Sequence, residues 1–213
     1  MKQAKRHPLI FGTMILTATG LITRVIGFFY RIYLSRLFGE EGMGIYQLLS
    51  PALSLSFSLT AAGYQTAISK YVAADSAKHP SGNLKPLLAG ISITLPLSLV
   101  TNAFLFFSAD PIGIFLLKDP RTVPMLRILS FSVPFAALHA CINGYFYGKK
   151  KASVPALTQL LEQLARVSCV FLVTGADLAE GRTPSINAAV LGLTVGEIFS
   201  MLIALVCLYI HLY

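Results

Sequence analysis

Residues 9–34 read LIFGTMILTATGLITRVIGFFYRIYL, and this stretch decides the class of fold. It is almost entirely apolar, and a helix needs only about 20 mostly apolar residues to cross a bilayer. Five more stretches of this kind follow, at residues 44–69, 87–107, 123–146, 154–174 and 185–209. The sequence therefore predicts an all-α polytopic membrane protein, built as a bundle of six transmembrane helices.

The hydrophilic junctions between these stretches alternate in charge. Every second junction is basic, with Lys2, Lys5 and Arg6, then Lys70, Lys78 and Lys85, then Lys149, Lys150 and Lys151. The other junctions are acidic, with Glu40 and Glu41, then Asp110 and Asp119, then Asp177 and Glu180. Because basic loops stay on the cytoplasmic side of a membrane, both termini are expected to be cytoplasmic.

The composition agrees with a membrane location, since 55% of the residues are hydrophobic, 12% are charged and the mean hydropathy is +0.70. This composition excludes an ordinary soluble domain. The net charge of +8 does not indicate a nucleic-acid partner, because nine of the 17 lysines and arginines lie in the basic junctions. The junctions are short, so we expect residues 1–213 to form one transmembrane unit.

The first span carries a polar line along one helical face. Its members recur at steps of three and four residues, namely Thr13, Thr17, Gly20, Arg24, Gly27 and Arg31. Arg24 lies roughly 20 Å along the helix from Leu9, at a depth where an arginine costs about 2.5–3.5 kcal/mol without water or a partner. Two interpretations stay open: Arg24 functions in a cavity, or it pairs with an acid and locks helices together. Gly20 and Gly27 are expected to let a neighbouring helix approach.

The fifth span repeats this logic with Gln159, Glu162, Gln163 and Arg166 on one face. An acid four residues before a base is the favourable orientation for a helical ion pair. Glu162 and Arg166 are therefore predicted to bond each other. They serve either as a structural pair or in direct handling of substrate or protons.

Weaker signals come from three other spans, which contribute Gln47, the pair His139 and Asn143, and Glu197. We expect His139 to be hydrogen bonded between helices rather than to act as a proton switch. Glu197 has no basic partner on its own helix. The predicted cavity residues are Arg24, Arg31, Gln47, Glu162, Arg166 and Glu197. Such a cavity suits an anionic or sugar-rich cargo, because a guanidinium matches phosphate bidentately, and no metal site is expected.

Three segments carry a resemblance to a known family. They are GTMILTATGLITRVIGFFYRIYLSRLFGEEGMGIYQLLSP at 12–51, AGYQTAISKYVA at 62–73 and GYFYGKKKASVPALTQLLEQLARV at 144–167. They resemble the polysaccharide biosynthesis proteins of the stage V sporulation protein B type. These belong to the multidrug/oligosaccharidyl-lipid/polysaccharide exporter superfamily, which also contains the lipid II flippases.

The resemblance implies two pseudosymmetric six-helix lobes around a central cavity, working by alternating access in the bacterial plasma membrane. The implied cargo is a lipid-linked saccharide with a pyrophosphate. This chain would supply one lobe, with a C-terminal lobe or a second chain as its partner. Arg24, in TRVIGF, looks like the family arginine that lines the cavity and favours the pyrophosphate. Arg31 matches the next cavity arginine only with a one-residue shift.

We expect a flippase driven by an ion gradient and without a cofactor, because the sequence has no GxxxxGK(S/T) nucleotide loop. A multidrug exporter of the same superfamily would bind cations in an acid-lined cavity, and the deep arginine counts against it. A membrane enzyme would need convergent acid–base or metal residues, and the junctions hold no HxxxxD, DxxD or paired-histidine pattern. The remaining alternative is an inactive half-length unit that needs a second lobe.

Overall fold

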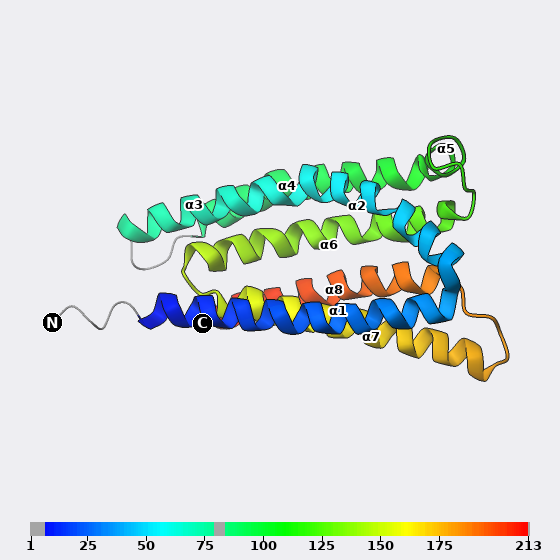
Figure 1. The fold of residues 1–213 in the computed structure, drawn as a ribbon. Helices are drawn as coiled ribbons and strands as arrows, with labels where there is room; N and C mark the ends of the chain where they lie inside the picture. The colour runs from blue at the N-terminus through cyan, green and yellow to red at the C-terminus, as the bar shows by residue number, and fades with distance from the viewer. Residues whose placement is uncertain (1–6, 79–83, 213) are drawn as a thin grey trace.

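The computed structural model describes residues 7–78 and 84–212, and every regular element in these residues is a helix (Figure 1). The elements are α1 (His7–Leu48), α2 (Ser50–Phe57), η1 (Ser58–Ala62), α3 (Gly63–Lys78), α4 (Lys85–Phe107), α5 (Ala109–Pro111), η2 (Ile112–Leu116), α6 (Thr122–Gly148), α7 (Ser153–Ala179) and α8 (Asn187–Leu212). The two η elements are single π-helical segments. The predicted all-α fold of a polytopic membrane protein is confirmed.

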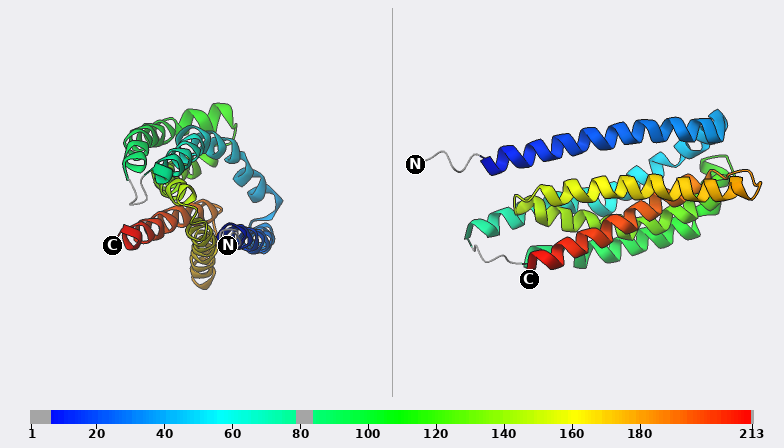
Figure 2. Two further views of the ribbon diagram at one scale, coloured as in Figure 1. Left: turned by 90° about the vertical axis from the view of Figure 1, so that its left-hand side faces the viewer. Right: turned by 90° about the horizontal axis from the view of Figure 1, so that it is seen from below.

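The longest helical stretch folds back on itself. Five stretches of the described chain are long and apolar enough to cross a membrane, and the first, Gly12–Ser76, has 65 residues. Gly39 interrupts it with a φ of 68° and a ψ of −174°, angles that glycine adopts without steric strain. After this break the chain turns back, so that α2, η1 and α3 run antiparallel to the first part of α1 (Figures 1 and 2). The described residues thus form six long rods.

The rods are arranged around α6. This helix packs against α3, α4 and α8, while α7 packs against α8 on one side and α1 on the other. The end-on view of Figure 2 places α6 between the α3–α4 pair and the α7–α8 pair, with α1 at the edge. α1 therefore contacts the rest of the bundle mainly through α7.

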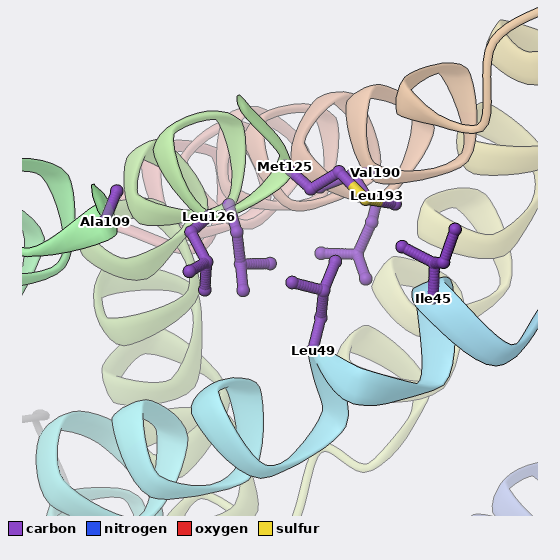
Figure 3. Packing of buried hydrophobic residues seen from close by; sticks show 8 residues of the cluster. Ile45, Leu49, Ala109, Met125, Leu126, Val190 and Leu193 are labelled. Carbon is purple, nitrogen blue, oxygen red and sulfur yellow. The ribbon is translucent and has the colours of Figure 1, made fainter. Parts of the chain in front are cut away.

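Buried apolar side chains hold the rods together near both ends. Close to the chain reversal, the segment around Leu49 packs against α6 and α8 (Figure 3). This cluster consists of Ile45, Leu49, Ala109, Met125, Leu126, Leu129, Val190 and Leu193. A second cluster joins α3, α4, α6 and α8, and consists of Ile68, Val72, Leu87, Cys141, Ile142, Tyr145, Phe146 and Ala204.

A glycine pair on α8 brings this helix against the backbone of α7. A Cβ atom added at Gly192 would lie 2.9 Å from the carbonyl oxygen of Arg166. One added at Gly196 would lie 3.1 Å from the carbonyl oxygen of Glu162. Small residues four positions apart permit this kind of close helix contact. The α8 side chains next to these two glycines therefore lie directly beside those of α7.

The glycines of the polar line on α1 do not have this role. Within the described residues, nothing lies within 4 Å of a Cβ added at Gly20, and one added at Gly27 meets only the amide nitrogen of Gln163, at 3.5 Å. The expectation that a neighbouring helix approaches closely at Gly20 is wrong for this part of the chain. The reason is that α1 lies at the edge of the bundle, with its polar face open.

Candidate functional site

A cavity of about 430 Å³ lies between the first part of α1, α7 and the end of α1 that follows Gly39. Three of the side chains that line it are arginines, and three others carry aromatic rings. The lining residues are Thr23, Arg24, Gly27, Phe28, Tyr30, Arg31, Leu34, Met43, Tyr46, Gln163 and Arg166. The cavity thus combines positive charge with aromatic surface.

The polar line of the first span forms one wall of this cavity. Arg24, Gly27 and Arg31 recur at steps of three and four residues, so one face of α1 presents all three. Both arginines are exposed, and neither forms an ion pair with a described residue. The helix-locking interpretation of Arg24 requires an acid partner, so this observation favours the cavity interpretation.

Arg166 of α7 forms the opposite wall. Its Nη2 donates a hydrogen bond of 2.5 Å to Oε1 of Glu162, one turn earlier, which confirms the predicted pair. Both side chains are largely buried, with exposed fractions of 21% for Arg166 and 16% for Glu162. The Nε of Arg166 is also buried and has no hydrogen-bond partner among the described residues. The guanidinium of Arg166 therefore lies between the cavity and a buried carboxylate, and its Nε has no acceptor among the described residues.

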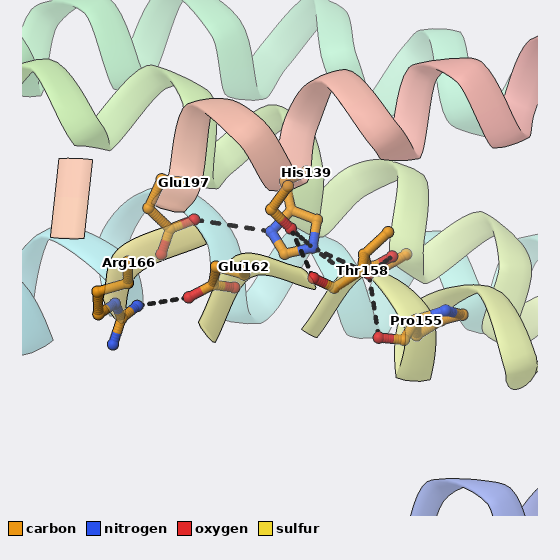
Figure 4. A network of polar contacts seen from close by, with 8 residues as sticks. His139, Pro155, Thr158, Glu162, Arg166 and Glu197 are labelled. Atoms are coloured by element: carbon orange, nitrogen blue, oxygen red, sulfur yellow. Dashed lines mark hydrogen bonds and ion pairs between the residues drawn. The ribbon is translucent and has the colours of Figure 1, made fainter. Parts of the chain in front are cut away.

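His139 of α6 is the centre of a polar network behind the cavity (Figure 4). Its Nε2 lies 2.6 Å from Nδ2 of Asn143, 2.9 Å from Oγ of Ser200 and 3.4 Å from Oγ1 of Thr158. Its Nδ1 lies 3.7 Å from Oε2 of Glu197. The expectation of a histidine hydrogen bonded between helices is confirmed, and Glu197 finds its partner on another helix.

Three potential ligand residues meet in this network, although the sequence predicted no metal site. One ligand atom each from His139, Glu162 and Glu197 lie within 4.8 Å of one another. Arg166 already occupies the carboxylate of Glu162, and its positive charge would repel a divalent cation at this distance. The described contacts of these side chains are ion pairs and hydrogen bonds.

The structure brings most of the predicted site residues together. The three predicted arginines line one cavity, and the two predicted glutamates lie directly behind Arg166. Gln47 is exposed and does not line the cavity. Tyr30 and Tyr46 line it and were not predicted. Tyr46 follows the break at Gly39, so only the chain reversal brings it next to the polar face of the first part of α1.

Comparison with known proteins agrees with this picture. The chain matches the family described as "Polysaccharide biosynthesis protein" over residues 9–213. It is 36% identical over 203 residues to stage V sporulation protein B of Bacillus subtilis (strain 168). The aligned residues cover 95% of this chain and 39% of that protein. It is 26% identical over 179 residues to lipid II flippase MurJ of the same organism. This alignment covers 80% of this chain and 32% of that protein. No solved structure matches the chain.

The chain thus spans about two fifths of the length of stage V sporulation protein B. The family match includes every residue that lines the arginine cavity and every member of the network behind it. Its long apolar helices make the chain a multi-pass membrane protein. The chain belongs to the polysaccharide biosynthesis protein family.

Proposed function

We propose that this chain is one lobe of a flippase that moves a lipid-linked oligosaccharide or cell-wall precursor across the plasma membrane. The proposal rests on the convergence of Arg24, Arg31 and Arg166 on one cavity. One relative is named a lipid II flippase, which is a transporter of this kind of cargo. The proposed role is transport in polysaccharide or peptidoglycan biosynthesis, without catalysis.

A pyrophosphate suits the chemistry of the cavity. Guanidinium groups present planar forks of donors that match phosphate oxygens two at a time. Arg24 and Arg31 have no acid partner among the described residues, so they are available to counter the two charges of a pyrophosphate diester. Phe28, Tyr30 and Tyr46 add flat apolar surface for a sugar face or a prenyl chain.

The cavity also disfavours a cation exporter as the alternative. A site for cationic drugs would present free carboxylates to its cargo. Neither Glu162 nor Glu197 lines the cavity, and both are engaged in the network behind it.

The open face of α1 motivates the rest of the proposal. A second six-helix lobe, from the same polypeptide or another chain, would cover this face and complete a central cavity. The two lobes would alternate between inward-open and outward-open forms, driven by an ion gradient. With basic junctions inside, both ends of the chain lie in the cytoplasm.

The test is reconstitution of the chain in vesicles, with and without the C-terminal lobe of a relative. A fluorescent pyrophosphate-linked saccharide is followed on each leaflet with an impermeant quencher. We expect the completed protein to move the lipid, Arg24→Ala to lose nearly all transport, and Arg24→Lys to lose a slight to moderate part. Lysine keeps the charge but loses the bidentate fork.

Arg182→Ala is the matched control. Arg182 lies in the exposed junction after α7 and pairs with Asp177 and Glu180, so its loss should leave transport at the wild-type level. Wild-type transport by Arg24→Ala would contradict the phosphate role of the cavity. Absence of transport in every combination of lobes would contradict the flippase assignment.

A further inference from the structure

The network behind the cavity carries an unbalanced charge. Glu162 and Glu197 bring two negative charges and Arg166 brings one positive charge, while His139 is neutral unless it binds a proton. The exposed fractions are only 12% for the His139 side chain and 17% for Glu197. A net charge is costly in such a buried place, so these four side chains favour the binding of one more positive charge.

A proton supplies this charge better than a metal ion. Hard cations prefer shells of oxygen ligands, whereas His139 offers a nitrogen. A divalent ion would also leave the group with a net positive charge beside Arg166. A proton fits the donor set directly, since imidazole and carboxylate groups both bind one.

Arg166 connects this group to the cavity. Its Nη2 bonds Glu162 at 2.5 Å, while the same guanidinium lines the cavity wall. A phosphate in the cavity would attract the same guanidinium and would weaken its ion pair with Glu162. Without its guanidinium, a buried carboxylate beside Glu197 is unfavourable as an anion and becomes neutral by binding a proton.

We propose that Glu162, with Glu197 and His139, is a proton-binding site that fills when the phosphate of the cargo lipid engages Arg166. This inference rests on the proposed function, because it needs a phosphate in the cavity. The guanidinium hydrogen bond moves from the Glu162 oxygen to a phosphate oxygen, and a proton from water moves to the Glu162 carboxylate. Cargo binding and proton binding are thereby linked at Glu162.

The polar and charged groups that face this site come from four helices. They are His139 and Asn143 of α6, Thr158 and Arg166 of α7, Glu197 and Ser200 of α8 and, across the cavity, Arg24 and Arg31 of α1. Asn143, Thr158 and Ser200 do not titrate, so they fix the orientation of the imidazole. The arginines stay charged, so the proton has to reside on the histidine or on a glutamate.

The experiment is calorimetry of farnesyl-pyrophosphoryl-N-acetylglucosamine binding to the full chain in lipid nanodiscs, in two buffers of different ionisation enthalpy. This pyrophosphate diester has no group that titrates near neutral pH, unlike a phosphate monoester with its second pKa of about 6. We expect the wild type to take up about one proton per bound lipid. Its affinity should then fall by up to about tenfold for each unit rise in pH.

Glu162→Gln should still bind the probe but should lose both the proton uptake and the pH dependence. Glu180→Gln, in the exposed junction after α7, is the matched control and should behave like the wild type. The buffer comparison on the wild type is decisive even if Glu162→Gln does not fold.

Wild-type binding without proton uptake, or uptake that persists in Glu162→Gln, would overturn the proton site and leave the proposed function standing. If folded wild-type protein does not bind the probe, either alone or completed with the C-terminal lobe of a relative, the phosphate cavity is overturned, and with it the proposed function.

Discussion

α1 and α7 both carry a line of polar and charged residues through an apolar helix, but the structure treats them differently. On α7, Arg166 is paired with Glu162, and α8 packs closely against both. On α1, Arg24 and Arg31 face an open cavity, with no ion-pair partner among the described residues. One helix has its charges balanced inside the chain, and the other does not.

The difference shows which charges in a membrane helix the fold itself compensates. A buried arginine with a carboxylate one turn away is compensated within the chain, because each charge offsets the desolvation of the other. A deep arginine without such a partner costs insertion free energy that the chain itself does not recover. A charge of the second kind indicates a ligand.

The largest expected effect on stability comes from Arg166→Gln, which leaves Glu162 and Glu197 close together without their cation. We expect the free energy of unfolding to fall by about 3 kcal/mol, as when one partner of a buried pair is removed. The double change with Glu162→Gln should recover most of this loss. Detergent titration of the folded protein measures both variants. Equal losses in the single and double variants would mean that the pair does not balance charge in α7.

Gly192→Ala tests the close contact that closes the α7 side. The added methyl group would lie 2.9 Å from the carbonyl oxygen of Arg166, so α8 would have to move away. We expect a loss of about 2 kcal/mol, typical of overpacking. Gly175→Ala on α7 is the control, because nothing described lies within 4 Å of its added Cβ atom. If both variants unfold at the same detergent concentration, the α7–α8 contact is looser than the structure has it.

A smaller effect on stability is expected at Arg121, which forms its ion pairs at the surface. It pairs with Glu41 at 2.6 Å and with Asp119 at 2.9 Å, and its hydrogen bonds hold the pKa of Asp119 below the ordinary value of 3.8. Because the folded pKa is the lower one, this stabilisation is present above pH 3.8 and is lost as the pH falls through the folded pKa.

Asp119→Asn should therefore weaken the acid sensitivity of unfolding and change stability at neutral pH less than either substitution above, since exposed pairs contribute little. Unfolding midpoints across this acid range measure it, with Glu40→Gln, an exposed carboxylate without an ion pair to a described residue, as the control. Unchanged acid sensitivity in Asp119→Asn would mean that the pair of Asp119 with Arg121 does not stabilise the fold.

The smallest effect on stability belongs to Arg24→Ala, although its effect on transport should be the largest. No described partner is lost, and alanine enters a membrane helix more easily than arginine. The same detergent titration should give a midpoint at or above that of the wild type. A loss as large as that of Arg166→Gln would break the comparison, because Arg24 would then be a locking residue too.

The local parts of this molecule could be predicted from the sequence, and the parts that join distant helices could not. Hydropathy predicted the rods, and the four-residue spacing predicted the pair of Glu162 with Arg166. Arg24 and Arg166 line the same cavity only because the bundle packs α1 against α7, which lies far away in the sequence. No local sequence pattern encodes this packing. The spacing of Gly192 and Gly196 is a readable signal of a close contact, but Gly20 shows that a glycine on a polar line does not guarantee a neighbour.

The position of α1 at the edge of the bundle has a consequence for biosynthesis. Among the described rods the ribosome makes α1 before the others, but its main protein neighbour, α7, emerges only after α2 to α4 and α6. During that interval the helix with Arg24 has to wait in the membrane, or at the insertion machinery, before it can dock. The earliest of these rods therefore docks only after α7 has emerged, and this docking is the step that forms the cavity.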